Sequence, residues 1–418
     1  MARFLYSSLL YLLLPLILLR LAYRSWRAPD YRRRVAERFG FFAPPPQTGG
    51  LWVHAVSVGE SIAAAPLIER FLQNHPNLPV VVTTMTPTGS ERVRAMFGER
   101  VFHVYAPYDL PGSVARFLSR VQPRALVIME TEIWPNMVCQ TRDRSVPVVL
   151  ANARLSARSA RGYARVKPLT EAVFSRFSMV AAQSQEDAER FVELGVAADS
   201  LQVTGSIKFD ISLREEQRQH ALEWRRDLGA RPVWIAASTH EGEDDILLSA
   251  HAALRKAQPD ALLILVPRHP ERFDSVAALV KQKGLSLARR SRSEQVAEVA
   301  VLLGDTMGEL VTLFGCADLA FIGGSLVERG GHNSLEAAAW GLPIITGPSD
   351  FNFAEISRQL QEAGALIPCS PSALPDQLVA LMKDESRRAR MGSAASQVVE
   401  SNRGALERLC GIVDRQLG

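Results

Sequence analysis

The stretch FIGGSLVERGGHNSLEAAAWGLPIITGP, residues 321–348, contains one complete unit of the predicted fold. It starts at the end of an apolar strand, passes through a glycine-rich loop, continues as a helix that Gly341 stops, and finishes in a second apolar strand. Parallel strands joined by a crossover helix are the repeating unit of α/β proteins. The stretch therefore predicts an α/β fold with a parallel sheet.

The same alternation of short apolar runs and helical stretches continues on both sides of this unit. The runs expected as strands in the first half are 51–56, 80–84, 101–105, 125–129, 146–151, 179–183 and 201–203. Those expected in the second half are 233–237, 261–266, 299–303, 319–323, 343–346 and 365–367. Because the runs are continuously apolar, their strands should be covered on both faces. The sequence predicts two doubly wound, Rossmann-like α/β domains facing a central cleft, with ligands at the carboxyl ends of the strands.

Shifts in composition divide the 418 residues into five expected segments. These are an apolar and basic N-terminal segment at 1–40, an α/β domain at 45–210, a polar linker at 211–231, a second α/β domain at 232–385, and C-terminal helices at 386–418.

The charge of the chain is concentrated at its N-terminus. The net charge is +4, yet residues 1–40 alone hold eight basic and two acidic residues, which leaves −2 for the rest. Because the positive charge is confined to residues 1–40, the rest of the chain lacks the broad basic face that nucleic-acid binding requires. No nucleic-acid partner is therefore predicted. Hydrophobic residues at 47% and charged residues at 22% are ordinary globular values and exclude collagen-like and disordered classes.

Several common site motifs are absent from the sequence. The four cysteines, Cys139, Cys316, Cys369 and Cys410, lie far apart without a C-x-x-C pair, which fits a reducing compartment and no disulfide framework. There is no H-E-x-x-H motif or histidine cluster, so no metal site is predicted. The sequence contains neither the G-x-x-x-x-G-K-[ST] motif of P-loop proteins nor the G-x-G-x-x-G motif of dinucleotide-binding folds. Both fold classes therefore lose support.

The N-terminal segment has the composition of a membrane anchor. Residues 4–19, FLYSSLLYLLLPLILL, carry no charge and are followed by a series of arginines. As a helix this run spans about 24 Å, less than the ~30 Å hydrocarbon core, so a short span and a partly inserted anchor are both open. A cleaved signal peptide is disfavoured because the positive charge follows the apolar run, and a buried core helix would have to cover an all-round apolar surface. The arginines should keep the rest of the chain on the cytoplasmic side.

Three charged residues of the first half follow predicted strands. Glu60 stands at the start of a helix after strand 51–56, where it is either a general base or an acidic residue that complements the helix dipole. As a base it would need an apolar or acidic environment to raise its pKa. Glu130 ends strand 125–129, with Glu132 close by, and is either part of a site or of an exposed turn. Lys208 leaves the last strand, where it either meets an anionic substrate or is simply solvated.

The second half has a more specific pattern, typical of phosphate and nucleotide binding. Arg268 and His269 follow strand 261–266 and are placed to hold a phosphate. Met307, Gly308 and Glu309 follow the next strand and are placed to wrap a nucleotide with backbone groups. The remaining candidates lie in the glycine-rich unit: Gly330 and Gly331 for close backbone approach, Asn333 or Ser334 as helix cap, and Glu336 as an acceptor for ribose hydroxyls. Helix capping in an ordinary βαβ unit is the alternative for this last group.

The ordered set of motifs resembles one known family. The arginine-rich anchor is followed by HAVSVGE at 54–60, METEIWPN at 129–136, GSIKFD at 205–210, VPRHPERF at 266–273, GDTMGEL at 304–310 and GGHNSLEAAAWG at 330–341. Each motif is modest alone, but in this order and over nearly the whole chain they resemble the 3-deoxy-D-manno-octulosonic acid (Kdo) transferases of lipopolysaccharide synthesis. The resemblance implies a GT-B fold in which the first domain binds the acceptor and the second binds the CMP-sugar.

The resemblance also implies an activity and a set of site residues. The expected reaction is the inverting transfer of one or two Kdo residues from CMP-Kdo to a lipid A precursor (lipid IVA), without a metal or other cofactor, at the cytoplasmic face of the inner membrane. By motif, Glu60 matches the catalytic base, and Glu130 and Lys208 match positions that stabilise the transition state. The CMP-binding segments match Arg268, His269, Met307, Gly308, Glu309, Asn333, Ser334, Leu335 and Glu336.

Two other functions are compatible with the sequence. Sugar-nucleotide 2-epimerases share the fold class and a carboxylate base, but a membrane anchor has no purpose for two soluble ligands. A membrane-tethered protein that only binds nucleotide-sugars would keep the second-half site and would not need Glu60.

Overall fold

The computed structural model describes residues 1–292 and 294–417, which form two compact units. The first unit contains residues 1–210 together with the chain from Gly404 onward, and the second contains Ile211–Arg403. The polar stretch expected as a linker at 211–231 carries helix α9 (Glu215–Leu228) within the second unit. Of the two C-terminal helices, α16 (Glu385–Asn402) belongs to the second unit and α17 (Ala405–Leu417) to the first.

The first unit is built on a seven-stranded sheet in the order β3-β2-β1-β4-β5-β6-β7, and all its strand pairs are parallel. Its strands are β1 (Leu51–His54), β2 (Val80–Thr84), β3 (Phe102–Tyr105), β4 (Ala125–Met129), β5 (Val148–Ala153), β6 (Met179–Ala182) and β7 (Leu201–Val203). Each predicted strand of this half is confirmed.

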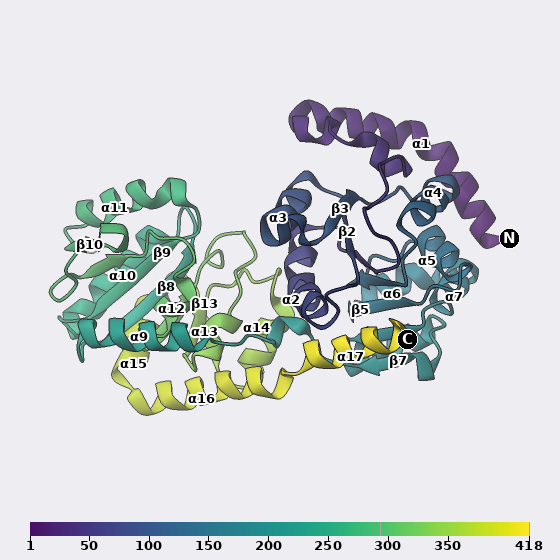
Figure 1. The fold of residues 1–418 in the computed structure, drawn as a ribbon. Helices are drawn as coiled ribbons and strands as arrows, with labels where there is room; N and C mark the ends of the chain where they lie inside the picture. Colours follow the sequence, from purple (N-terminus) through teal and green to yellow (C-terminus); the bar gives the residue numbers. More distant parts are fainter. Residues whose placement is uncertain (293, 418) are drawn as a thin grey trace. The chain divides into compact units, whose positions relative to one another are not determined.

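Helices cover both faces of this sheet, as the continuous apolar runs predict (Figure 1). Alternate residues of β1 point to opposite cores: Leu51 and Val53 pack on one side and Trp52 on the other. The helices of the first side are α2 (Val58–Asn74), α3 (Pro87–Phe97) and α17, whose apolar face lies in this core. Those on or beside the other face are α4 (Pro111–Val121), α5 (Pro135–Arg142), α6 (Ala157–Ala164), α7 (Lys167–Phe174) and α8 (Gln185–Glu193).

The second unit repeats this architecture with a parallel sheet in the order β10-β11-β9-β8-β12-β13-β14. Its strands are β8 (Val233–Thr239), β9 (Leu262–Pro267), β10 (Leu287–Arg289), β11 (Val301–Leu303), β12 (Leu319–Ile322), β13 (Ile344–Thr346) and β14 (Leu366–Pro368). Its further helices are α10 (Asp244–Ala257), α11 (Phe273–Gln282), α12 (Leu310–Phe314), α13 (Leu335–Ala339), α14 (Ala354–Glu362) and α15 (Leu374–Lys383). The predicted strands are again confirmed; β10 was missed because this short edge strand buries only Ala288.

The strand orders locate the ligand-binding edge of each unit. In the first sheet the chain runs from β1 outward to β3 and then returns to β4 on the other side of β1. The second sheet has the same reversal between β8 and β12. In doubly wound folds, ligands bind beyond the carboxyl ends of the strands where the order reverses. The loops after β1, β4, β8 and β12 are therefore the places to look for a site.

The N-terminal segment forms one long helix, α1 (Ala2–Arg27), which continues through Pro15. Its most apolar window has a mean hydropathy of 1.9 and is only 6% buried. The helix is long and apolar enough to anchor the protein to a membrane.

Candidate functional site

Glu60 lies at the reversal point of the first sheet, in the first turn of the helix that follows β1. Ser57 caps helix α2 by accepting a hydrogen bond from the Glu60 amide at 3.2 Å. The Glu60 carboxylate turns back on the same cap and accepts from the Ser57 hydroxyl at 2.7 Å and from the Val56 amide at 2.8 Å. This reciprocal capping fixes the carboxylate at the carboxyl end of β1.

The environment of Glu60 favours a proton acceptor that titrates above its ordinary range. Burial raises the pKa of Glu60 most, and the nearby carboxylates of Glu132 and Glu130 raise it further. The bonds from Ser57 and Val56 act in the opposite direction, because they stabilise the charged form. The net direction is upward, as a working general base requires.

Glu130 and Lys208, which the sequence placed after different strands, form an ion pair. Glu130 follows β4 in a left-handed backbone conformation with φ +54° and is 9% exposed. Its carboxylate lies 3.4 Å from the Lys208 amino group and accepts from Arg154 Nε at 3.0 Å. A strained backbone conformation at a buried charge is typical of functional sites. The predicted carboxylate and cation are therefore brought together at the edge that also carries Glu60.

In the second unit a buried carboxylate that the sequence reasoning missed organises the glycine-rich loop after β12. Glu243 is 0% exposed and accepts four backbone hydrogen bonds. They come from the amides of His240, Gly324, Ser325 and Leu326 at 2.7–3.0 Å. The amides of residues 324–326 are thus occupied within the protein, and the carboxylate fixes the loop where the strand order reverses.

Three histidines meet beside Arg268 at this edge. The rings of His240 and His332 are stacked with centroids 5.1 Å apart, and their Nε2 atoms are 2.8 Å apart. His269 approaches His240 edge-on at 5.3 Å. Burial and the surrounding cations lower the pKa of His332 to about 4 and lower that of His240 as well. Both rings are therefore neutral near pH 7, one donating to the other, and arginines that include the exposed Arg268 supply fixed positive charge beside them.

The predicted cap and carboxylate of helix α13 are present, and the structure distinguishes between the two candidates for the cap. Asn333, not Ser334, makes the capping bond, by accepting from the Leu335 amide at 3.1 Å. The Ser334 hydroxyl is buried and has no hydrogen-bond partner among the described residues. Burial raises the pKa of Glu336, whose carboxylate has no ion pair within the described part of the chain. The half-buried Glu336 carboxylate is therefore able to accept hydrogen bonds from a ligand, whereas the Ser334 hydroxyl is enclosed by the protein.

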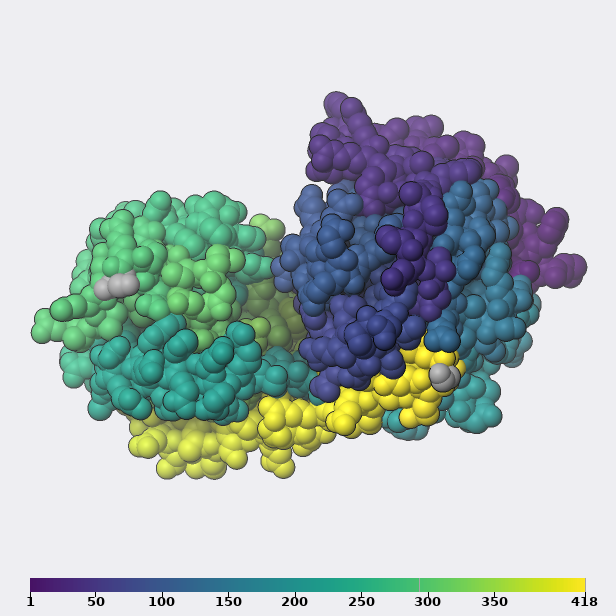
Figure 2. All heavy atoms as spheres, viewed as in Figure 1, coloured from purple at the N-terminus to yellow at the C-terminus, as the bar shows by residue number. Residues whose placement is uncertain are grey.

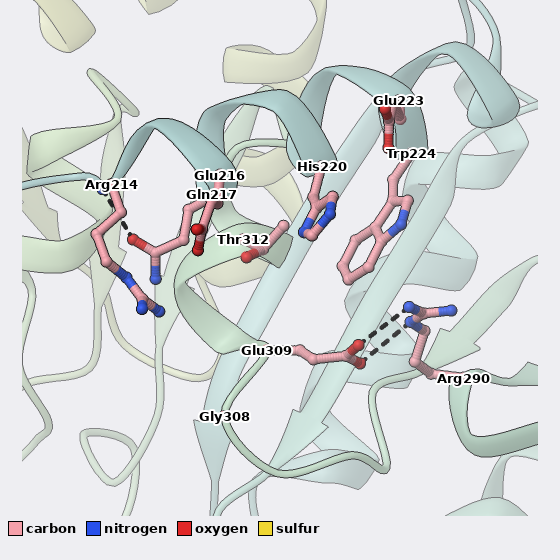
Figure 3. A pocket seen from close by; sticks show the side chains of 10 residues that line it. All are labelled: Arg214, Glu216, Gln217, His220, Glu223, Trp224, Arg290, Gly308, Glu309 and Thr312. Atoms are coloured by element: carbon pink, nitrogen blue, oxygen red, sulfur yellow. Dashed lines mark hydrogen bonds and ion pairs between the residues drawn. The ribbon is translucent and has the colours of Figure 1, made fainter.

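The segment Met307–Glu309 borders a pocket of about 500 Å³ in the second unit. Figure 3 shows Glu309 held by two bonds from Arg290, whose guanidinium lies 4.0 Å from the centroid of the Trp224 ring. The pocket is lined by Arg214, Glu216, Gln217, His220, Glu223, Trp224, Arg290, Gly308, Glu309 and Thr312. Met307 is 69% exposed nearby. A flat aromatic ring, a guanidinium and backbone groups suit a planar, polar ligand.

The residues that sequence reasoning missed carry a signal that could have been used. Arg154 directly follows β5, the neighbour of β4, and His240 directly follows β8. Glu243 comes four residues after the end of β8, just before helix α10. Each stands at a strand's carboxyl end beside the reversal point, which the rule for doubly wound sheets already singles out. No group of three or more His, Cys, Asp or Glu that could hold a metal occurs in residues 1–292 and 294–417.

Comparison with known proteins assigns the chain to a family. A family model described as 3-deoxy-D-manno-octulosonic-acid transferase (kdotransferase) matches residues 33–211, and one described as glycosyl transferases group 1 matches residues 231–398. The 3-deoxy-D-manno-octulosonic acid transferase of Haemophilus influenzae is 47% identical, covering 99% of this chain and 98% of that protein. The chain belongs to the Kdo transferase family. The Kdo transferase of Bordetella pertussis is 39% identical over the whole of both chains.

Solved structures extend the comparison to the fold of this Kdo transferase family member. A glycosyltransferase from Rickettsia africae has a TM-score of 0.54 at 13% identity, covering 89% of this chain and 99% of that one. A UDP-GlcNAc 2-epimerase from Neisseria meningitidis has a TM-score of 0.56 at 15% identity, covering 88% and 99%. At these identities the likeness concerns the fold alone. The protein is a glycosyltransferase with two parallel-sheet α/β domains of the GT-B type.

Proposed function

We propose that this enzyme transfers Kdo from CMP-Kdo to a lipid A precursor, with inversion at the anomeric carbon, at the cytoplasmic face of the inner membrane. The observation that carries the mechanism is the Glu60 carboxylate, held at the reversal point of the first sheet with a raised pKa. Family membership supports the choice of sugar, and the apolar helix α1 supports a lipid acceptor.

In the proposed reaction Glu60 accepts the proton of an acceptor hydroxyl. The hydroxyl oxygen forms a bond to the anomeric carbon while the bond between that carbon and the CMP phosphate oxygen breaks, and its electron pair leaves with the phosphate. Positive charge that develops on the sugar ring faces the carboxylates near Glu60, and Lys208 is suited to the carboxylate of the sugar. Arg268 neutralises the departing phosphate, and Glu336 accepts from the ribose hydroxyls. No step of this scheme requires a metal.

The proposed activity is tested by mass spectrometry of a tetra-acylated lipid A precursor incubated with freshly generated CMP-Kdo, with and without a chelator. We expect a mass gain of one or two Kdo residues that survives chelation. No mass gain from a preparation that binds CMP would contradict the assigned acceptor, and a gain lost on chelation would contradict metal independence.

Replacing Lys208 by Ala should lower the rate of transfer about 100-fold, the usual cost of removing one preorganised electrostatic partner. Its amino group is the partner of Glu130 at 3.4 Å, so the substitution also leaves that buried carboxylate with Arg154 alone. Lys167→Ala is the matched control, since Lys167 forms an exposed pair with Glu171 at 3.5 Å. Steady-state kinetics measures the rate of transfer by both variants. Equal rates for Lys208→Ala and Lys167→Ala would show that Lys208 has no role in the mechanism.

The pocket beside Gly308 and Glu309 is the proposed site of the cytidine, with Trp224 as its aromatic wall. Loss of stacking on an aromatic side chain costs about 1–3 kcal/mol per base, so Trp224→Ala should weaken CMP binding about 10-fold. Leu222→Ala, at an exposed position of the same helix, should leave the affinity unchanged. Titration calorimetry with CMP measures the affinity of both variants. An unchanged affinity for the Trp224 variant would show that the cytosine binds elsewhere.

A further inference from the structure

Helix α1 is attached to the first unit by polar contacts at its N-terminal end. Arg3 pairs with Asp143 at 3.1 Å, and the Tyr6 hydroxyl donates to Asp109 at 3.0 Å. The Ser7 hydroxyl lies 3.2 Å from the Asn136 side-chain oxygen.

Two of the acceptors, Asp109 and Asn136, are buried groups of the unit itself. Asp109 also accepts from the amides of Asn136 and Met137 at 2.9 and 2.7 Å, which holds it at the start of helix α5. The first turns of α1 therefore complete a buried polar network, and removing them would expose part of that network or leave it unpaired.

The other end of α1 is attached to the same unit. The chain continues into the short helices η1 (Pro29–Arg32) and η2 (Val35–Phe39). Arg34 donates to the His103 carbonyl at 2.9 Å, and the buried Arg38 donates to the Met85 carbonyl at 3.0 Å. Both ends of α1 are thus fixed to one globular body, which must lie on one side of a bilayer.

The exposure pattern along α1 agrees with these attachments. Buried or partly buried positions recur every three or four residues: Arg3, Ser7, Leu10, Leu14, Ile17, Leu21 and Ser25. Such a stripe is the face that packs on the protein. Large apolar side chains cover the opposite side: Phe4, Leu5, Leu9, Leu12, Leu16, Leu19 and Trp26 are 52–75% exposed. Figure 2 shows the purple N-terminal residues at the outer edge of the first unit.

We propose that α1 lies in the plane of the cytoplasmic leaflet and does not cross the membrane. Its outward face would sit among the upper acyl chains, as in other interfacial helices, and the exposed Arg20, Arg24 and Arg27 would meet lipid phosphates. A crossing orientation would carry Tyr6 and Ser7 away from Asp109 and Asn136. This inference rests on the membrane attachment that the proposed function includes, and it chooses between the two anchor geometries that the sequence left open.

The sidedness of residue 2 tests the proposal in full-length protein. Ala2→Cys and Ala36→Cys are compared in a Cys410→Ser background, because Cys139, Cys316 and Cys369 are buried. A membrane-impermeant maleimide is applied to spheroplasts and to inverted inner-membrane vesicles. We expect both cysteines to react only in inverted vesicles; reaction of the Ala2→Cys variant in spheroplasts, with the Ala36→Cys control protected, would overturn the proposal.

The depth of the helix provides a second test. An environment-sensitive fluorophore is attached at Leu12→Cys, on the outward face, and at Leu222→Cys as the exposed control on α9. The protein is bound to phosphatidylethanolamine and phosphatidylglycerol vesicles with nitroxides near the head or near the tail of the acyl chain. We expect the fluorophore at residue 12 to be quenched more by the shallow nitroxide, because interfacial helices lie about 5–10 Å deep.

Other quenching patterns overturn the proposal. Stronger quenching by the deep nitroxide at residue 12 indicates a crossing helix, and no quenching indicates that another protein surface, such as a second copy, covers this face. Transfer of Kdo is measured on the same preparations. Transfer together with a crossing helix would refute only this inference, whereas an in-plane helix without transfer would refute the proposed function.

Discussion

Glu60→Gln should lower kcat for Kdo transfer about 100- to 10,000-fold, the range over which general bases contribute, and should leave CMP affinity unchanged. Gln keeps an oxygen to accept from the Ser57 hydroxyl but cannot take a proton from the acceptor. It also loses the bond from the Val56 amide, so a small loss of stability, about 1 kcal/mol, is expected. Because CMP binding is proposed for the second unit, unchanged CMP affinity shows that the second unit is intact. Thermal melting checks the fold of the first unit, which contains Glu60.

Glu69→Gln is the matched control for this prediction. It lies on the same helix, is exposed, and pairs with Arg100 at 2.7 Å away from the strand ends. We expect it to retain full transfer. If Glu60→Gln retained comparable turnover, Glu60 would be reduced to a capping residue of α2, the alternative that its position in the sequence allows.

The pH dependence of kcat/KM distinguishes a general base from a structural residue. If Glu60 only capped helix α2, its titration would not shape the pH profile. Burial and neighbouring carboxylates raise the pKa of Glu60 above its ordinary value of 4.5. A base works only when deprotonated, so kcat/KM should rise with pH through this raised pKa and fall off below it. The fall of kcat/KM at low pH should persist in Glu69→Gln. It should be absent from the residual activity of Glu60→Gln.

The fold could be predicted almost completely from the sequence because buried parallel strands leave a strong local signal. Runs such as 125–129 are apolar at every position, and their order of occurrence fixes a doubly wound topology. The membership of the last helix left no such signal. Apolar residues of α17 repeat at helical spacing, but only tertiary contacts reveal that Leu409 and Ile412 complete the core of the first unit.

The candidate site was predictable in part, for a physical reason. Residues that stand immediately after a strand, such as Glu130, are placed by topology, so their meeting with Lys208 follows from the sheet once its order is known. For a residue that binds the backbone of a distant segment, the sequence can mark its place after a strand but does not record its partner. Glu243 binds amides 81–83 positions further along the chain, and nothing in the sequence around either segment records that contact.

Glu243→Gln should destabilise the second unit and abolish its ligand site together. The amide nitrogen of Gln cannot accept, so two of the four backbone amides that now bond to this carboxylate would be left buried without a partner. Each costs about 1–3 kcal/mol, which gives a loss of about 2–6 kcal/mol in the free energy of unfolding. CMP affinity should fall about 10-fold or more, because the loop after β12 would no longer be held where the strand order reverses.

Glu241→Gln, two residues earlier in the same loop and exposed, is the control that keeps the chemistry of the change constant. We expect it to match the unaltered protein in thermal melting, CMP titration and hydrogen exchange. In Glu243→Gln the amides of Gly324, Ser325 and Leu326 should exchange faster even under conditions where the unit stays folded. Equal exchange in the two variants would show that the carboxylate does not hold this loop.

The same arrangement limits which groups can bind the CMP phosphate. Backbone amides of a glycine-rich loop after a strand are a common anion site, but here Glu243 already occupies those of residues 324–326. A phosphate brought to these amides would meet a buried carboxylate of the same sign, so the anion has to be held by other groups, such as the Arg268 side chain. Arg268→Ala should therefore weaken CMP binding without affecting exchange of the loop amides, whereas Glu243→Gln should change both.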